Sequence, residues 1–245
     1  MSSKLKDLLS SLLSQEELEL LVGSYDIVGD IAIIIVPDEL LPRKNVIGEV
    51  ILHSNKNVKV VARRSGNYGG EFRTIKLEVI AGEERKETLI TEFGVRLQVN
   101  VETTYFSVRS GNERRRVASL VEPGEQVLVM FSGIGPYPLV IAKHSDAGNV
   151  VGVEKNPLAH GYALQNLKAN KGLQNVRFYE MDVSGLPQSM EQRFDRIVMP
   201  LPTMGHLFLP EGLGMLKSDG GWLHYYEMAK DGAFDAASVR IAEAC

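Results

Sequence analysis

The segment from Gln126 to Asn156 constrains the possible fold more than any other part of the chain. It begins with residues 127–131, a short and almost wholly apolar run without alternation, which is typical of a strand buried on both faces of a parallel sheet. The glycine turn Ser132-Gly133-Ile134-Gly135 breaks this run, and apolar residues at 139–142 predict a helix. A second buried strand covers residues 150–153 and ends on Glu154. This order of elements is that of the first half of a nucleotide-binding βαβ unit.

The glycine turn also indicates which kind of nucleotide the unit binds. Only two of the three glycines of the dinucleotide-binding pattern are present, and Pro136 after the second one has no N–H for a pyrophosphate. Glu154 follows about 20 residues later, where a carboxylate can accept hydrogen bonds from both ribose hydroxyls. A ligand with ribose and adenine but no phosphate fits best, so we predict S-adenosylmethionine. The alternative is a tight turn without a ligand, and the position of the acid favours the ligand.

The composition excludes several classes of protein. The chain has 245 residues and 44% hydrophobic residues, which predicts two domains or one large one with an ordinary core. No apolar run approaches the ~20 residues of a membrane span, and the N-terminus lacks the apolar core of a signal peptide, so we expect a cytoplasmic protein. The single cysteine, Cys245, excludes an internal disulfide and a cysteine metal cluster, and the five histidines lack metal-ligand spacing.

The charge is unevenly distributed along the chain. Residues 43–116 contain 15 Lys and Arg against 9 Asp and Glu, a net charge of +6, whereas the remainder carries −10. A basic middle segment in an acidic protein suggests a polyanionic partner for that segment. A solvated basic face is an equally good explanation on charge alone.

The residue pattern divides the chain into four parts. Residues 1–23 form a helical segment, in which Ser14 and Glu17 make a capping box and Gly23 can end the second helix. Residues 24–104 form a small α+β domain, and residues 105–117 form a connecting motif. Residues 118–245 form an α/β domain with alternating strands and helices. The leucines expected on one face of the first segment are Leu5, Leu8, Leu9, Leu12 and Leu13.

Strands and helices follow from the same patterns. In the small domain we expect strands within 27–36 and at 58–62, 74–80, 88–91 and 95–99. In the α/β domain we expect further strands at 176–179, 196–199 and 222–226, and helices at 158–169, 207–216 and 231–244. Short crossovers of this kind imply a parallel sheet with helices on both faces.

Ligands of such sheets bind beyond the carboxyl ends of the strands, and several distinctive residues lie there. They include Asp182, which can accept a hydrogen bond from an adenine amino group. The loop Pro200-Leu201-Pro202 can shape the pocket where a target base meets a methyl group. The connecting motif adds two aromatic residues and four arginines around one glutamate, which offer stacking surfaces and phosphate contacts. A charged interdomain linker is the alternative, and composition alone favours it.

With these residues placed, the chain resembles the archaeal and eukaryotic-type tRNA guanine-N1 methyltransferases from about Tyr25 to its end. This family uses S-adenosylmethionine to methylate the guanine at position 37, on the 3′ side of the anticodon. The matching pieces are Tyr25-Asp26-Ile27-Val28-Gly29-Asp30-Ile31-Ala32, Gly70-Glu71-Phe72-Arg73, Tyr105-Phe106-Ser107 with Arg109 and Glu113-Arg114, Phe131-Ser132-Gly133-Ile134-Gly135-Pro136, Asn156-Pro157, and Asp195-Arg196-Ile197-Val198-Met199-Pro200-Leu201-Pro202.

The resemblance implies a fold and a set of roles. The fold is a Rossmann-like class I methyltransferase domain, preceded by a small basic α+β domain that binds and positions the anticodon stem-loop of tRNA. Glu113 is the expected general base, and Arg73 is expected near the guanine O6. Arg109, Arg114 and Pro202 are expected to bind the substrate. The expected cofactor-binding residues are Tyr105, Phe131, Gly133, Gly135, Glu154, Asp182 and Pro200, and no metal is expected.

The chemistry of the reaction requires such residues. A sulfonium methyl donor is already activated and needs positioning more than acid catalysis. Guanine N1 carries a proton at neutral pH, so a carboxylate must remove it while a cation near O6 stabilises the developing charge. One Glu and one Arg are therefore the minimum, and both are expected from outside the cofactor domain.

Three departures from the family pattern leave alternatives open. The family usually has an acid at the position of Val129, and a proline at that of Val108. Methyltransferases of this class normally add two strands after the last helix, so we expect five strands with an exposed edge that a continuation or a partner would cover. One alternative is a wybutosine-pathway enzyme that transfers an aminocarboxypropyl group to tRNA, which Arg109 and Pro200-Leu201-Pro202 disfavour. Another is a non-catalytic tRNA-binding remnant that has lost cofactor binding, which Val129 and the missing strands support.

Overall fold

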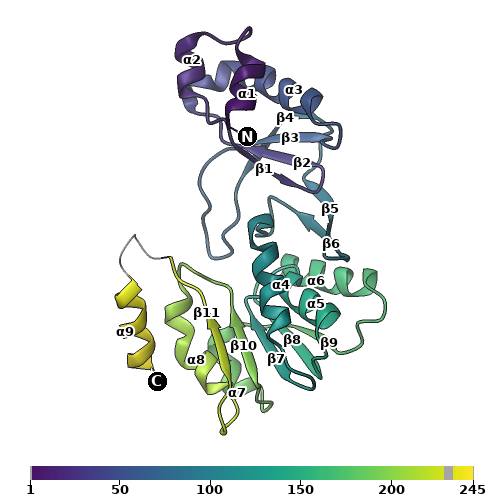
Figure 1. Ribbon diagram of the computed structural model, residues 1–245, viewed down its shortest axis with the longest axis vertical. Coiled ribbons are helices and arrows are strands. Elements are labelled where there is room, and N and C mark those ends of the chain that lie inside the picture. The colour runs from purple at the N-terminus through teal and green to yellow at the C-terminus, as the bar shows by residue number, and fades with distance from the viewer. Residues whose placement is uncertain (1, 229–233, 245) are drawn as a thin grey trace. The chain divides into compact units, whose positions relative to one another are not determined.

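The computed structural model describes residues 2–228 and 234–244, which form two compact units (Figure 1). The N-terminal unit comprises Met1–Thr91 and Gln98–Val108, and the C-terminal unit comprises Glu92–Leu97 and Arg109–Cys245. Each unit has its own sheet and its own hydrophobic core.

The N-terminal unit is built on a four-stranded sheet in the order β1-β2-β3-β4. Its strands are β1 (Tyr25–Val28), β2 (Ile31–Ile34), β3 (Val60–Arg64) and β4 (Leu77–Gly82). β2 and β3 are parallel, whereas the two outer pairs are antiparallel. The helices of this unit are α1 (Ser2–Leu9), α2 (Gln15–Leu20), α3 (Lys44–Ser54) and the 3-10 helix η1 (Asp38–Arg43). Apolar side chains of α1 and α3 form one core cluster with residues of β2, β3 and β4.

The first helical segment agrees only partly with the sequence prediction. The structure buries Leu5, Leu9 and Leu13, but it leaves Leu8 42% and Leu12 48% exposed. A single-faced stripe of five leucines was therefore the wrong expectation, because α1 ends at Leu9 and only the i, i+4 series faces the core. The capping box is confirmed, since the side chain of Ser14 accepts a hydrogen bond from the backbone N–H of Glu17 and the Glu17 carboxylate accepts one from the N–H of Ser14. α2 does not extend to Gly23, because its C-cap is Leu21 in an extended conformation.

A β-hairpin of β5 (Glu87–Glu92) and β6 (Val95–Asn100) belongs partly to each unit. Phe93 and Gly94 form its tight turn, and both have positive φ angles, 48° and 75°. Side chains of the C-terminal unit hold the tip of the hairpin. Lys143 Nζ donates to the carbonyl of Gly94 at 2.8 Å, a ring nitrogen of His144 lies 2.7 Å from the carbonyl of Phe93, and the Asn170 side chain bonds the N–H and C=O of Arg96.

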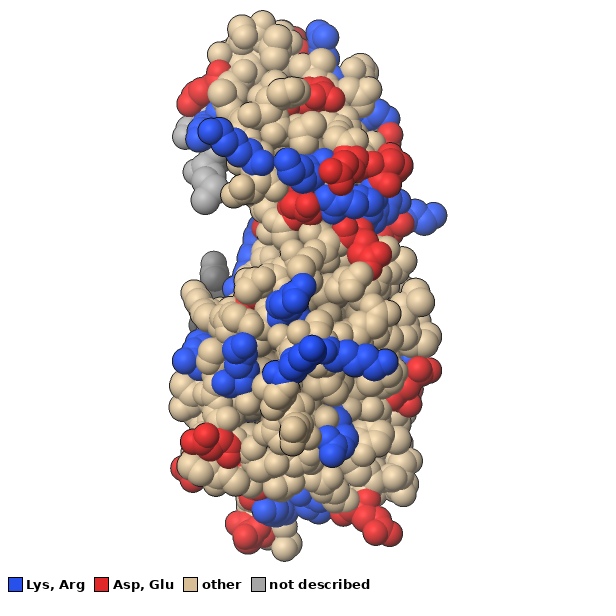
Figure 2. All heavy atoms as spheres, turned by 90° about the vertical axis from the view of Figure 1, so that its right-hand side faces the viewer, with Lys and Arg blue, Asp and Glu red and all other residues tan. Residues whose placement is uncertain are grey.

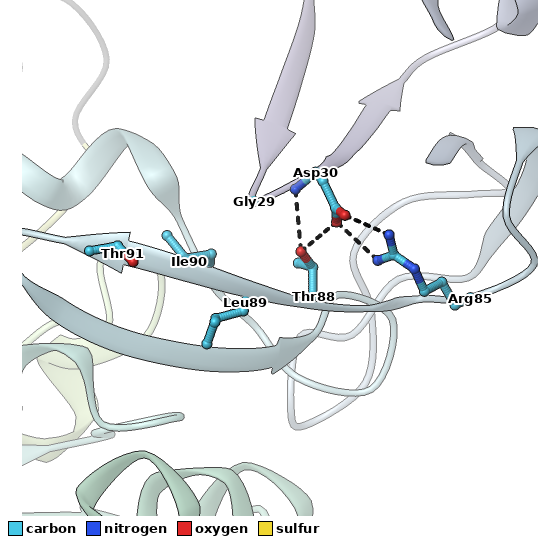
Figure 3. Close-up of a pocket in the computed structure, with 7 residues that line it drawn as sticks. All are labelled: Gly29, Asp30, Arg85, Thr88, Leu89, Ile90 and Thr91. Atoms are coloured by element: carbon cyan, nitrogen blue, oxygen red, sulfur yellow. Dashed lines mark hydrogen bonds and ion pairs between the residues drawn. The ribbon is translucent and has the colours of Figure 1, made fainter. Parts of the chain in front are cut away.

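The root of the hairpin is fixed to the β1–β2 turn of the N-terminal unit (Figure 3). Arg85 donates two hydrogen bonds to the carboxylate of Asp30 at 2.6 and 2.9 Å, and the Thr88 hydroxyl donates a third at 2.7 Å. The Arg85 guanidinium holds the pKa of Asp30 below its usual range. Gly29 in this turn has a φ of +60°, and a Cβ there would lie 2.2 Å from Thr88 Oγ1. These groups line the pocket in Figure 3 with Leu89, Ile90 and Thr91.

The C-terminal unit contains a five-stranded, wholly parallel sheet in the order β11-β10-β7-β8-β9. Its strands are β7 (Gln126–Met130), β8 (Asn149–Glu154), β9 (Val176–Glu180), β10 (Arg196–Met199) and β11 (Trp222–Tyr225). The α/β fold and the parallel sheet are thus confirmed, and the central strands β7 and β10 are almost completely buried, as their unbroken apolar runs predict.

Helices accompany both faces of this sheet, as Figure 1 shows. They are α4 (Gly111–Ser119), α5 (Pro136–His144), α6 (Pro157–Ala169), α7 (Leu186–Ser189), α8 (Leu209–Gly214) and α9 (Phe234–Ala244), with the short 3-10 helices η2 (Val108–Ser110), η3 (Val183–Gly185) and η4 (Gly205–Phe208). α7 and α8 contribute Leu186 and Leu209 to the core cluster on one face, beside Met130 and Met199.

The structure differs from the sequence prediction at two segments of this unit. The sequence predicted one helix over 207–216, but the structure divides it into η4 and α8. Residues 105–117 were expected as a connection, but most of this stretch forms α4. The last helix was predicted from Asp231, which lies outside the described residues, and α9 runs from Phe234 to Ala244. Within the part of the chain that the structure describes, no helix has the length and apolar character needed to cross a bilayer.

The positive charge of residues 43–116 is not a property of the whole N-terminal unit. That unit carries 12 Lys and Arg against 15 Asp and Glu, a net charge of −3. Acids from outside the basic segment pair with its arginines, as in the ion pairs Arg43–Glu17, Arg64–Asp26 and Arg85–Asp30. Figure 2 shows basic and acidic side chains lying against each other in the upper part of the view.

Candidate functional site

The parallel strands of the C-terminal unit bring several predicted residues to one edge of its sheet. All five strands run in the same direction, so the residues that follow β7, β8, β9 and β10 meet at their carboxyl ends. Phe131 and the glycine turn follow β7, Glu154 ends β8, Asp182 follows β9, and Pro200 follows β10.

Glu154 ties the glycine turn to the second strand. Its carboxylate accepts hydrogen bonds from the backbone N–H of Gly133 and from that of Asn156, both at 2.7 Å. Burial raises the pKa of Glu154, and the N–H donors of Asn156 and Gly133 oppose that shift. The backbone N–H of Lys155 is a third donor to this carboxylate, which has about four acceptor positions, so capacity for a hydroxyl donor remains.

The glycine turn is shaped by close packing beneath it. Gly133 and Gly135 have φ angles of +56° and +89°, which favour glycine. A Cβ on Gly135 would lie 2.7 Å from Cζ of Phe178, and one on Gly152 would lie 2.6 Å from Cδ1 of the same ring. The hydroxyl of Ser132 in the turn is buried and has no hydrogen-bond partner among the described residues. An orphaned buried hydroxyl at this point fits a site that takes a polar ligand.

The loop after β10 contacts the turn after β7. Phe131, whose φ is +55°, packs its ring against Phe208 with centroids 5.2 Å apart. Pro200 and Pro202 flank Leu201 in this loop, and the carbonyl of Pro202 accepts a hydrogen bond from the N–H of Met228 at 3.0 Å. The loop is therefore anchored at the same edge of the sheet as Glu154.

Asp182 caps η3 and pairs with a neighbouring lysine. Its Oδ1 accepts hydrogen bonds from the N–H and the hydroxyl of Ser184, at 3.0 and 2.9 Å, while Oδ2 lies 2.6 Å from Lys155 Nζ. The Lys155 ammonium and the Ser184 donors lower the pKa of Asp182 to about 2. The carboxylate is thus ionised at neutral pH, and its side chain is 41% exposed.

Glu113 lies in the first turn of α4 and has two partners. Arg116 donates two hydrogen bonds to its carboxylate, both at 2.7 Å, and the hydroxyl of Tyr226 donates a third at 2.5 Å. The Arg116 guanidinium, with a smaller contribution from Tyr226, lowers the pKa of Glu113. Sequence reasoning missed Tyr226, although its position directly after β11 at the carboxyl edge of the sheet was a usable signal.

Arg114 is buried in an ion pair, whereas a residue that binds the substrate directly would have to be exposed. Its side chain is 3% exposed and donates to both carboxylate oxygens of Glu92, at 2.7 and 2.6 Å. Its guanidinium also lies 5.8 Å from the ring centroid of Tyr137. The structure therefore argues against direct contact of Arg114 with RNA, because the helix turns this side chain inward towards the hairpin tip.

Arg73 and Tyr105 belong to the N-terminal unit, whereas Glu113 and Glu154 belong to the C-terminal unit. Within the N-terminal unit the Arg73 guanidinium lies over the ring of Tyr105, 5.0 Å from its centroid. Tyr105 meets Tyr68 edge to face at 5.7 Å, and the guanidinium of Arg64 lies over Tyr68 at 5.2 Å. Arg73 has a φ of 49°, a conformation set by the turn that starts at Gly70.

The substrate-binding prediction for Arg109 stays a prediction. Arg109 lies in η2 and is exposed. The structure thus brings together Phe131, Gly133, Gly135, Glu154, Asp182, Pro200 and Pro202 at one sheet edge. Among the described residues it shows no group of three His, Cys, Asp or Glu side chains that could hold a metal ion.

Comparisons with known proteins agree on one family. Residues 88–245 match the TRM5/TYW2 methyltransferase domain, and residues 5–85 match the TYW2 N-terminal domain. A tRNA (guanine(37)-N(1))-methyltransferase Trm5b of Pyrococcus abyssi is 39% identical over 218 residues, which cover 89% of this chain and 64% of that protein. The chain therefore spans less than two thirds of that relative. A tRNA(Phe) (4-demethylwyosine(37)-C(7)) aminocarboxypropyltransferase of Pyrococcus horikoshii is 32% identical and covers 91% of this chain and 78% of that one.

Solved structures give the same result. The complex of aTrm5 with tRNALeu superimposes with a TM-score of 0.88 at 32% identity, over 98% of this chain and 70% of that chain. The TYW2 of M. jannaschii in complex with AdoMet superimposes with a TM-score of 0.65 at 25% identity, over 90% of this chain and 84% of that one.

The Arg114–Glu92 pair predicts a stability effect. Arg114→Met should lower the free energy of unfolding by about 3–5 kcal/mol, because it leaves the buried Glu92 carboxylate without its cation. Urea denaturation measures the change. Arg115→Met is the matched control on the same helix, and its exposed side chain should shift stability by less than about 0.5 kcal/mol. A variant of Arg114 that keeps full stability but loses RNA binding would restore the substrate-binding role.

Proposed function

Because the chain belongs to the TRM5/TYW2 methyltransferase family, we propose that it transfers a methyl group from S-adenosylmethionine to N1 of the guanine at position 37 of tRNA. The observation that carries the proposal is the similarity to tRNA (guanine(37)-N(1))-methyltransferases over about nine tenths of the chain. The carboxyl edge of the parallel sheet, with Glu154 and the glycine turn, is the supporting feature of the structure.

The residues at this edge fit S-adenosylmethionine. Glu154 has acceptor capacity for a ribose hydroxyl, the Ser132 hydroxyl lacks a partner among the described residues, and Asp182 is an ionised, partly exposed carboxylate that could accept from an adenine amino group. Phe131, Gly133, Gly135, Pro200 and Tyr105 complete the proposed set of cofactor-binding residues. When bound, the cofactor supplies a methyl group already activated on a sulfonium centre.

The remaining work for the protein is proton removal and charge stabilisation. In this proposal the Glu113 carboxylate takes the proton from guanine N1, and the Arg73 guanidinium stabilises the charge that develops at O6. The target base must leave its stack in the RNA loop, at a cost of a few kcal/mol. Aromatic and arginine side chains such as Tyr105 and the exposed Arg109 suit contacts to an unstacked nucleotide and its phosphates. Pro202 would border the base.

The substrate partner is the anticodon stem-loop of tRNA, and we place the protein in the cytoplasm. Support for the partner comes from the solved aTrm5–tRNALeu complex, whose protein superimposes on nearly the whole chain.

Aminocarboxypropyl transfer to a tRNA base is the second candidate function. The match of residues 5–85 to the TYW2 N-terminal domain and the aminocarboxypropyltransferase relative favour it. The higher identity to the Trm5b relative, 39% against 32%, favours methyl transfer, as do Arg109 and Pro200-Leu201-Pro202.

Mass spectrometry of the RNA product tests the proposal. After incubation of the protein with purified tRNA and S-adenosylmethionine, anticodon-loop fragments should gain the mass of one methyl group at position 37. The larger increment of an aminocarboxypropyl group would establish the second function instead. No gain of mass with correctly folded protein would favour the non-catalytic alternative.

The Glu154 contacts predict a loss of cofactor affinity. Glu154→Ala should weaken S-adenosylmethionine binding about 10–100-fold, because a charged acceptor is worth roughly 1.5–3 kcal/mol. Since burial raises the pKa of Glu154, wild-type affinity should also fall as the pH drops and the carboxylate becomes protonated. Calorimetric titration measures both effects. Glu180→Ala, an exposed carboxylate at the end of the neighbouring strand, is the control. Unchanged affinity would remove Glu154 from the site.

The base assignment predicts a kinetic effect. Glu113→Gln keeps the size of the side chain but cannot take a proton, so single-turnover methyl transfer should slow by ~10²–10⁴-fold while cofactor and tRNA still bind. Arg73→Ala should also slow the chemical step, because the developing charge at O6 loses its cation. Glu122→Gln, an exposed acid near the end of the same helix, serves as the control. If Glu113→Gln keeps wild-type chemistry and only unfolds more easily, the base assignment fails, and Asp182 becomes the next carboxylate to test.

A further inference from the structure

The Glu113 carboxylate is held by two side chains of different character. Arg116, one turn along the same helix, bonds Oε2 through Nε and Oε1 through Nη2, and its side chain is 53% exposed. Tyr226 comes from the segment after β11 and donates its hydroxyl to Oε1. Arg116 is therefore a long, flexible side chain at the surface, whereas Tyr226 presents a rigid ring inside the unit.

The arginine pair conflicts with the proposed role of Glu113. A general base needs a free acceptor position on a carboxylate oxygen that can reach the proton of the nucleobase, and Arg116 and Tyr226 together take three of the about four positions on Glu113. The Arg116 guanidinium also lowers the pKa of Glu113, which weakens the carboxylate as a base. RNA supplies phosphates that compete for an exposed arginine, because Arg–phosphate pairs are strong and bidentate.

We propose that Tyr226 is the positioning residue of Glu113. The Tyr226 hydroxyl keeps the Glu113 carboxylate in place when Arg116 leaves it for the RNA backbone. This inference rests on the proposed function. It assigns Arg116 as the partner that substrate releases and Tyr226 as the partner that stays.

The surroundings of Tyr226 suit a fixed hydroxyl donor. Tyr137 of α5 donates its hydroxyl to that of Tyr226 at 3.4 Å, and the two rings lie 6.5 Å apart. Burial raises the pKa of Tyr226, so its hydroxyl stays protonated and donates at neutral pH. A ring has fewer rotatable bonds than an arginine side chain and holds its position at lower entropic cost.

The other groups facing Glu113 leave the tyrosine as the remaining donor. On β11, burial and the nearby Arg196 lower the pKa of His224 to about 4, so this imidazole is neutral at neutral pH. Tyr137 contributes an uncharged hydroxyl, whose own pKa burial raises. Once Arg116 is withdrawn, the Tyr226 hydroxyl is the direct side-chain donor that remains on the carboxylate among the described residues.

The sign of the pH effect follows from the hydrogen bond. The Tyr226 hydroxyl stabilises the ionised form of Glu113, as Arg116 does, so loss of the hydroxyl should raise the pKa of Glu113. The acid limb of the pH–rate profile should then move to higher pH. A tyrosine that only filled space would leave that limb where it is.

Tyr226→Phe tests the proposal, because it removes one oxygen and keeps the ring. The single-turnover rate of methyl transfer at saturating tRNA should fall roughly 10–100-fold, the effect of losing a hydrogen bond to a charged group, with unchanged dissociation constants for tRNA and cofactor. Tyr225→Phe is the matched control, since that hydroxyl bonds Glu227 instead. The proposal fails if Tyr226→Phe keeps the wild-type rate and acid limb, or if the two variants behave alike.

A second measurement separates this inference from the proposed function. The ¹³C resonance of the Glu113 carboxyl, assigned with Glu113→Gln, reports its titration in the free protein without any RNA. Tyr226→Phe should raise the midpoint, and adding Tyr226→Phe to Arg116→Ala should raise it above that of Arg116→Ala alone. If Tyr226→Phe leaves the titration midpoint of Glu113 unchanged in both the wild-type and the Arg116→Ala protein, the positioning role is overturned, even if the protein methylates tRNA. A raised midpoint in a protein that modifies no tRNA confirms the contact and rejects the function.

Discussion

The hydrogen bonds of the Glu154 carboxylate hold the candidate site together. A parallel sheet collects the ends of its strands at one edge, but it does not by itself fix the turns that follow them. Glu154 fixes two of these turns, because its carboxylate accepts hydrogen bonds from the N–H of Gly133, in the turn after β7, and from the N–H of Asn156, at the start of α6. The same carboxylate is available for a ligand hydroxyl, so the group that orders the free site is also the one that would recognise the ribose.

Sequence reasoning succeeded where the determining interactions are local or uniform. β10 lies at 196–199 as predicted, because the unbroken apolar run Ile197-Val198-Met199 is typical of a strand buried on both faces. The capping box of Ser14 and Glu17 depends on residues three apart, so it is visible in sequence. α4 was missed because its surface is dominated by charge, and Arg114 occupies one of its few buried positions.

Burial of that arginine could not be predicted from local sequence. Its partner, Glu92, comes from the tip of the β5–β6 hairpin, 22 residues earlier, and only the folded C-terminal unit brings the two together. Neighbouring residues of α4 point about 100° apart, so Glu113 faces Tyr226 while Arg114 faces Glu92. The two residues of this Glu-Arg dipeptide therefore have different surroundings: Arg114 is buried in an ion pair, whereas Glu113 is the residue that we propose as the base. The resemblance to the family suggested that both act on the substrate.

The ion pair of Glu113 places a physical limit on how such a site can work. A carboxylate that is strongly paired is easy to keep ionised but is a weak base, whereas one without partners is a better base but poorly oriented. In our proposal two side chains meet these requirements separately. The exposed Arg116 keeps the Glu113 carboxylate ionised in the free protein, whereas the inward-facing Tyr226 keeps it oriented. Exchange of the arginine for an RNA phosphate would then raise the basicity of the carboxylate only when substrate is present. Chemistry and substrate binding would be coupled through one guanidinium, without any rearrangement of the sheet.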